Sequence, residues 1–134
     1  MSEAAVIICV HGNPLPKQSY RSVKGGGYTD PRIKAWQETV SWKAHEAMID
    51  RKIFECPVEV HITFWRTSGA RVDLDNLSKC ALDALNGVVF SDDCQAIDLH
   101  LHKRVNKQNP GCRIRVAPAK EESWVDLETG VDAL

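Results

Sequence analysis

The sequence predicts an α+β fold in which two helices pack on a mixed, mostly antiparallel sheet, in the order β-α-β-α-β-β. Two observations indicate this fold. Two segments repeat apolar residues at the spacing of an α-helix, and two others alternate apolar and polar residues as half-buried strands do. With 134 residues, of which 43% are hydrophobic and 26% charged, the chain has the composition of an ordinary globular protein. We therefore expect one domain with a single core.

The first half of the chain is expected to contain a strand, a long loop and a helix. Residues 4–10 form an apolar run, which predicts a strand buried on both faces. Residues 12–30 are rich in glycine, proline and basic residues, and their number exceeds what a simple connection needs, so we expect a functional loop. Asp30 is then expected to cap a helix whose first residue is Pro31 and which continues to about residue 50.

The second half is expected to contain a strand, a helix and two further strands. Residues 58–65 alternate cleanly and predict a half-buried strand. Residues 75–86 predict an amphipathic helix that stops at Gly87. Residues 95–103 alternate again, and residues 113–117 predict a last strand. The residues expected to be buried on the strand over 95–103 are Ile97, Leu99 and Leu101.

The end of the chain differs in charge from the rest. Residues 119–134 carry one lysine against five acidic residues, whereas residues 1–118 carry 16 basic and 13 acidic residues. The tail therefore has a net charge of −4 and the body a net charge of +3. We predict a folded domain over residues 1–118 and an acidic, flexible tail over residues 119–134. A modestly basic body with an acidic tail is compatible with DNA binding.

Composition also disfavours several classes of protein. The five cysteines are odd in number and form no CxxC pair, so a zinc site and a disulfide framework are both disfavoured. No apolar run approaches the ~20 residues that a membrane-spanning helix needs. Residues 4–10 lack the basic leader of a signal peptide and are too few for one. We therefore expect a cytoplasmic protein without a membrane partner.

Several aspartates fall within the segment DLDNLSKCALDALNGVVFSDD. Asp73 and Asp75 lie two residues apart just before the predicted helix, where an extended backbone lets both carboxylates address one metal ion. A site built from oxygen ligands suits Mg²⁺ best, with Mn²⁺ as the expected substitute. Taken alone, such a pair is more often a helix N-cap beside a solvated acid.

The lysine and the second aspartate pair of this segment are further candidates. Lys79 lies four residues after Asp75, on the same helix face, where it can stabilise charge on a phosphate group. A surface ion pair with Asp75 or Asp83 is the commoner role of such a lysine. Asp92 and Asp93 follow the helix, and a chain reversal can return them towards the first pair. The alternative is an ordinary polar turn.

Two groups of cations are candidates for contact with nucleic acid. The loop over residues 12–30 combines lysine and arginine with Tyr20 and Tyr28, a mixture that suits phosphate contact and base stacking. A second basic cluster follows the strand over residues 95–103. Solvated loops are the alternative for both. The predicted DNA contacts are Lys17, Arg21, Lys24, Lys79, Lys103 and Arg104.

Polar residues also gather on one face of the strand over residues 95–103. Asp98, His100 and His102 alternate along it, and such a set can bind a transition metal. Period-two polar residues on a solvent-facing strand are far commoner, and we favour that interpretation.

The aspartate segment resembles the signature of the RusA-type Holliday junction resolvases. It has Asp-x-Asp-Asn, a lysine four residues beyond the second aspartate, an Asp-Ala-Leu-Asn-Gly stretch and an Asp-Asp pair. The segments GNPLPKQSYRS and TDPRIKAWQE resemble the amino-terminal opening of the family and the start of its first helix. The resemblance covers about residues 6–117, and its independent elements occur in the right order and spacing.

The resemblance implies a homodimeric, Mg²⁺-dependent endodeoxyribonuclease that nicks four-way DNA junctions symmetrically, in DNA recombination and repair. By position, Asp73, Asp75 and Asp93 match the metal-binding and catalytic aspartates of the family. Lys79 matches its essential lysine, and Asp92 lies beside a catalytic position. The alternatives are a related nuclease that acts on flaps or forks, and a catalytically silent protein that binds junctions. The acidic tail departs from the basic character common in such enzymes.

Overall fold

A computed structural model describes residues 5–17, 22–23, 26–27, 30–69 and 71–120. Its elements, in chain order, are β1 (Val6–His11), β2 (Ser22–Val23), β3 (Gly26–Gly27), α1 (Pro31–Ala47), β4 (Val58–Arg66), α2 (Leu74–Leu85), the short 3₁₀ helix η1 (Asp93–Gln95), β5 (Ala96–Val105) and β6 (Gly111–Pro118). The predicted order of the main elements is confirmed. The loop over residues 12–30 additionally holds the short antiparallel pair β2–β3.

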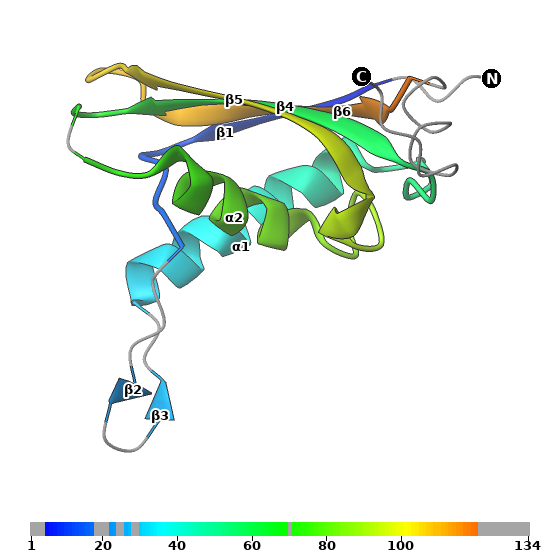
Figure 1. Cartoon of the computed structure of the whole chain (residues 1–134). Coiled ribbons are helices and arrows are strands. Elements are labelled where there is room, and N and C mark those ends of the chain that lie inside the picture. The colour runs from blue at the N-terminus through cyan, green and yellow to red at the C-terminus, as the bar shows by residue number, and fades with distance from the viewer. Residues whose placement is uncertain (1–4, 18–21, 24–25, 28–29, 70, 121–134) are drawn as a thin grey trace, which may run out of the picture.

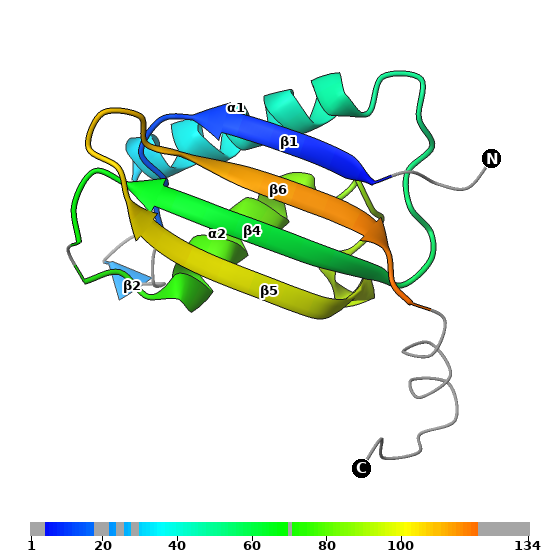
Figure 2. The ribbon, with the colours of Figure 1, turned by 90° about the horizontal axis from the view of Figure 1, so that it is seen from above.

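The two helices lie on one face of a four-stranded sheet whose strand order is β1-β6-β4-β5 (Figure 1). β6 pairs antiparallel with both β1 and β4, whereas β4 and β5 run parallel. The mixed, mostly antiparallel sheet predicted from the sequence is therefore confirmed. In Figure 2 the opposite face of the sheet is turned to the viewer, and neither of the two described α-helices lies over it.

The core fills the space between the sheet and the helices. β4 alternates as predicted and buries every second side chain on the helix side. α1 and α2 each contribute one apolar stripe, because their apolar residues recur every three or four positions. The central buried residues are Val58, Val60, Ile62 and Phe64 on β4, Trp36, Val40 and Ala44 on α1, and Leu77, Ala81 and Leu85 on α2.

The helix ends follow from local sequence. The Asp30 side chain accepts a hydrogen bond from the backbone N–H of Arg32 at 2.8 Å and caps α1, as predicted. The hydrogen bonds from the Arg32 side chain and backbone hold the pKa of Asp30 below its usual value. α1 ends at Ala47, earlier than expected from the apolar pattern. Gly87, just after α2, has a φ of 76°, which a residue without a side chain adopts readily.

Two predictions about burial are wrong, and both concern the edges of the sheet. β1 is an edge strand that buries only Val6, Ile8 and Val10 and leaves alternate residues exposed, so it is not buried on both faces. On β5, the opposite edge strand, Leu99 is 42% exposed although the alternation predicted its burial. Ile97 and Leu101 are only partly buried. On β1 the exposed residues point to the face of the sheet that no described helix covers, whereas Leu99 shares the helix side with Val60 and is exposed because β5 lies at the edge.

Within the described part of the chain, neither helix combines the length and the apolar character needed to cross a bilayer.

Gly111 offers a test of the sheet packing. A side-chain methyl there would overlap the backbone carbonyl of Val10, so β1 would have to move. We expect Gly111→Ala to lower the free energy of unfolding by about 1–3 kcal/mol, measured by urea denaturation. Gly69→Ala is the matched control, because its methyl would meet only the Val105 side chain at an ordinary 3.8 Å. Equal stability of the two variants would contradict the close approach of β1 and β6.

Candidate active site

The exposed face of α2 carries two of the predicted residues. Asp75 and Lys79 lie one turn apart on this face, with Lys79 Nζ 3.4 Å from Asp75 Oδ2. Both side chains are open to solvent, with exposures of 75% for Asp75 and 57% for Lys79. The ion pair anticipated from their spacing is therefore present, and both groups remain accessible to a ligand. An exposed pair of this kind adds at most ~1 kcal/mol to stability, so folding alone gives little reason for it.

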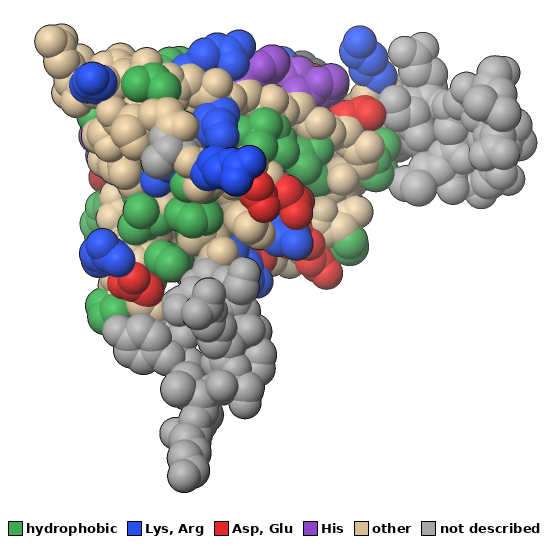
Figure 3. Space-filling model, turned by 60° about the vertical axis from the view of Figure 1, so that its left-hand side comes forward, with side chains coloured by type: hydrophobic (Ala, Val, Ile, Leu, Met, Phe, Trp, Pro, Cys, Tyr) green, Lys and Arg blue, Asp and Glu red, His purple; other side chains and the backbone are tan. Residues whose placement is uncertain are grey.

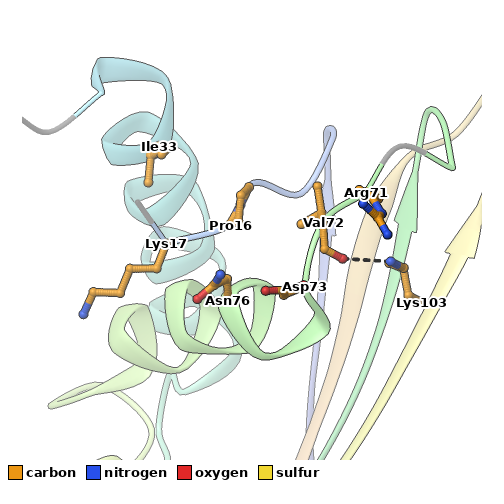
Figure 4. A pocket seen from close by; sticks show the side chains of 8 residues that line it. All are labelled: Pro16, Lys17, Ile33, Arg71, Val72, Asp73, Asn76 and Lys103. Carbon is orange, nitrogen blue, oxygen red and sulfur yellow. Dashed lines mark hydrogen bonds between the residues drawn. The ribbon is translucent and has the colours of Figure 1, made fainter. Parts of the chain in front are cut away.

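Asp73 occupies the N-cap position of α2, but its side chain makes no capping hydrogen bond. An aspartate at this position usually accepts a hydrogen bond from the second or third helical N–H group. The Asp73 carboxylate instead lines a hollow with a volume of about 650 Å³ (Figure 4). Its oxygens therefore do not cap the helix N-terminus and remain available within the hollow.

The hollow brings together side chains from four parts of the chain. Asp73 and Asn76 lie on the first turn of α2, whereas Lys103 reaches in from β5 (Figure 4). Lys103 Nζ donates a hydrogen bond to the backbone carbonyl of Val72 at 2.8 Å, which holds this ammonium group beside the start of α2. The complete lining is Pro16, Lys17, Ile33, Arg71, Val72, Asp73, Asn76 and Lys103. With three cations and one carboxylate, the hollow has the character of an anion-binding site.

Lys17 joins the loop after β1 to α2. Its backbone N–H donates to the Asn76 carbonyl at 2.9 Å, and its Nζ lies 2.8 Å from Asp83 Oδ2. The hydrogen bond and charge of Asp83 raise the pKa of the Lys17 ammonium above its usual value, and the Asp93 carboxylate acts in the same direction. Lys17 therefore stays charged beside Asp83.

The second aspartate pair is held by a local network. Asp92 caps η1, in which the Gln95 side chain accepts hydrogen bonds from the backbone N–H groups of Ser91 and Asp92 at 2.9 and 3.0 Å. The Gln95 amide also donates to the carbonyls of Phe54 and Cys56 at 2.9 and 3.0 Å. Gln95 thus fixes the reversal that leads into β5. It was missed in the sequence, although Asp-x-x-Gln is a capping-box spacing.

The aspartates are therefore distributed over two places. Asp73 and Asp75 lie at the start of α2, whereas Asp93 begins η1, after the chain reversal that follows α2. Within residues 5–69 and 71–120, apart from the gaps in the loop, no three acidic, histidine or cysteine side chains are grouped as ligands for one metal ion. Asp98, His100 and His102 form no such group either, which agrees with a solvent-facing strand.

The predicted DNA contacts also differ in position. Lys17 and Lys103 line the hollow together with Arg71, which was not predicted from the sequence. Arg104 lies on the opposite face of the sheet, because successive residues of β5 alternate in direction. Arg21 and Lys24, with Tyr20 and Tyr28, lie outside the described residues.

Basic and acidic side chains are neighbours on this part of the surface. Figure 3, which brings the left side of Figure 1 forward, shows Lys and Arg side chains directly beside a group of Asp and Glu side chains. Such a surface can place cations on phosphate groups while carboxylates hold a divalent ion between them. The arrangement thus suits chemistry at a phosphate ester.

Cysteine chemistry has no evident part in this site. All five cysteines are free thiols. Burial raises the pKa of Cys80 to about 11 and that of Cys112 to about 12, so both stay protonated at neutral pH. The buried thiols act as small apolar side chains, as expected from the sequence.

Comparison with known proteins agrees with the sequence motif. The family described as endodeoxyribonuclease RusA matches residues 11–117 of this chain. The crossover junction endodeoxyribonuclease RusA of Escherichia coli strain K12 is 32% identical over 91 residues, which are 67% of this chain and 75% of the relative. The protein of the same name from Shigella sonnei strain Ss046 has the same identity and coverage.

Proposed function

This chain belongs to the RusA family of endodeoxyribonucleases, and from that premise we propose that it is a Mg²⁺-dependent Holliday junction resolvase. It would cut four-way DNA junctions by paired symmetric nicks, in DNA recombination and repair. The observation that carries the proposal is the placement of Asp73, Asp75 and Lys79, all exposed, within the N-cap and first two turns of α2, next to a cation-lined hollow. Accessible carboxylates and cations at one point are what hydrolysis of a phosphodiester requires.

The donor chemistry of the aspartates fits Mg²⁺. Asp73, Asp75 and Asp93 offer hard oxygen ligands, and the Asp73 carboxylate is not used to cap its helix. We propose that these three residues hold the ion and that Mn²⁺ substitutes for it. Carboxylates repel one another unless a cation lies between them, so the ligand set is expected to draw together on metal binding. When bound, the ion would supply positive charge beside the scissile phosphate and lower the pKa of a water ligand.

The cations of the chain would position the DNA. Lys17, Arg71 and Lys103 line the hollow and would contact phosphate oxygens on either side of the cut. Lys103 is already held by the Val72 carbonyl, so less side-chain freedom is lost when it binds a phosphate. These contacts select no base, which suits an enzyme that recognises the shape of a junction.

Lys79 would act on the reacting phosphate itself. Its ammonium group lies 3.4 Å from Asp75 and is exposed, so it can turn from the carboxylate towards a phosphate oxygen. There it would offset the negative charge that develops as water attacks phosphorus. Asp75 would orient Lys79 through their ion pair as well as contribute an oxygen ligand.

A homodimer would match the symmetry of the substrate. A four-way junction presents two equivalent strands related by a twofold axis, and each copy of this chain carries one such set of residues. A dimer with C₂ symmetry would place one set on each strand and so produce paired nicks.

The test is nicking of a labelled synthetic four-way junction, compared with a linear duplex and a flap of matched sequence. We expect paired nicks at symmetric positions in the junction alone, with Mg²⁺ or Mn²⁺ and not with EDTA. Tight junction binding without cutting would instead identify a silent binding protein. Preferred cutting of the flap would identify a flap nuclease. Equal cutting of all three substrates would contradict the proposed selectivity for junctions.

A further inference from the structure

β5 lies at one edge of the sheet, where it pairs with β4 alone among the described strands. We infer that β5 of one copy pairs antiparallel with β5 of the other across a twofold axis at Leu101. This inference rests on the proposed function, of which the homodimer is a part, and it names the surface and the register of that dimer.

β5 has the properties of a strand that lacks a neighbour. It spans ten residues at the end of the strand order and pairs only with β4 among the described strands (Figure 2). Leu99 is 42% exposed and Val105 is 54% exposed on this strand. A long edge strand with exposed apolar side chains is a template for pairing with another chain. A second β5 would satisfy its open backbone groups and cover these side chains.

The opposite edge of the sheet suits this role less well. β1 has six residues, VIICVH, and contains no Lys, Arg, Asp or Glu to select a register. At its start, Arg51 of the same chain donates a hydrogen bond to the Ala5 carbonyl at 3.3 Å. β5 is therefore the edge with both the length and the charges to define a partner.

The register follows from symmetry and charge. A twofold axis perpendicular to the sheet keeps each side chain on its own face, so facing residues must come from the same face. With the axis at Leu101, Asp98 of each copy faces Arg104 of the other. Opposite charges that face each other on paired strands are stabilising. Among the described residues, neither Asp98 nor Arg104 takes part in an ion pair within one copy.

Neighbouring registers lose this complementarity. An axis at His100 would place Arg104 opposite Ala96, and an axis at His102 would place Arg104 opposite His100. The regular pairing of β5 with β4 also begins at Asp98, after a register shift at its start, and ends at Val105. An axis at Leu101 therefore keeps the contact within the regular part of β5. It also places Asp98 of each copy opposite Arg104 of the other.

This dimer would have a defined relation to the candidate active site. In each copy the helices cover one face of the sheet (Figure 1). A twofold axis perpendicular to the sheet would join the two sheets edge to edge and place both helix layers on the same side. The two exposed faces of α2 would then address a single DNA substrate from one side.

Charge reversal tests the interface. We expect sedimentation equilibrium to show a dimer for the full chain at micromolar concentration. Asp98→Arg and Arg104→Asp should each raise the dissociation constant by about tenfold, because like charges then face each other twice. The double variant should restore dimerisation, since it exchanges the partners and keeps the pairs. A monomeric full chain, or single variants that dimerise normally, would overturn the interface.

A disulfide cross-link tests the register. In a background that replaces the exposed Cys9 and Cys94 by serine, Leu101→Cys would face its own copy and should oxidise to a covalent dimer. His100→Cys is the matched control and should remain uncoupled, because it would face His102. Cross-linking of the control alone would overturn the register. A monomer that nicks junctions would overturn the interface alone, whereas a β5-paired dimer that does not nick would overturn the function alone.

Discussion

Replacing Asp75 by asparagine is expected to reduce the rate of junction nicking by about 10²- to 10³-fold, while the fold and junction binding stay intact. The substitution keeps the shape of the side chain and removes its charge. It therefore replaces a negatively charged ligand of the proposed ion by a neutral amide and removes the charge that holds Lys79 at 3.4 Å. Loss of one electrostatic contact at a reacting centre typically costs about 3–4 kcal/mol in the barrier, which corresponds to this change in rate.

The same substitution should have little effect on stability. Asp75 is 75% exposed, and its ion pair with Lys79 lies in solvent, where such pairs contribute at most ~1 kcal/mol. A large loss of nicking with an unchanged unfolding transition therefore separates a catalytic role from a structural one. Single-turnover nicking at saturating enzyme is the measurement, so that weaker binding does not appear as slower chemistry.

Asp50→Asn is the matched control for this experiment. Asp50 is also an exposed aspartate, and its φ of 61° is a conformation that asparagine tolerates as well. We expect this variant to nick junctions at the wild-type rate. If Asp75→Asn also retained that rate, the aspartates of α2 would not carry the reaction, and the proposed mechanism would be wrong.

The parts of the fold that were predicted correctly are those that local sequence determines. Asp30 and Pro31 start α1 through capping and a fixed φ, and these depend on neighbouring residues alone. β4 alternates cleanly because it lies between two strands and has helices on one face only. Periodicity is informative wherever one face of an element is buried along its whole length.

The errors concern properties that depend on distant parts of the chain. β1 and β5 have the apolar residues of buried strands, but Ile7 on β1 points to the face of the sheet without a described helix, and Leu99 on β5 lies at the edge of the helix-covered face. The order of strands in a sheet is not encoded in the alternation of any one strand. Edge strands of this composition also suit association, so the same mismatch between sequence and burial led to the proposed β5 interface.

The sequence predicted several residues of the candidate site, but it did not predict how separate elements bring them together. Spacing along one helix placed Asp75 and Lys79 together, because residues four apart share a face. The hollow beside them is built from separate elements, and Arg71 and Lys103 meet there only through tertiary packing. The position of Asp93 depends in part on the Gln95 side chain, which joins this reversal to the distant carbonyls of Phe54 and Cys56.

The largest expected effect on stability comes from Phe64. This side chain lies on β4, which is flanked by β5 and β6, and it is fully buried beneath the helices. Phe64→Ala would remove its apolar contacts and leave a cavity that the surrounding strands can close only in part. We expect the free energy of unfolding to fall by about 3–5 kcal/mol, measured by urea denaturation followed by circular dichroism.

Trp42→Ala is the control, because Trp42 is a larger aromatic side chain that is 68% exposed on α1. Its loss should change the free energy of unfolding by no more than about 0.5 kcal/mol. Both variants are compared with the wild type at one protein concentration, since association adds to the stability of a dimer. Burial, and not aromatic size, then accounts for the difference. A loss below about 1 kcal/mol for Phe64→Ala would contradict the placement of β4 at the centre of the core.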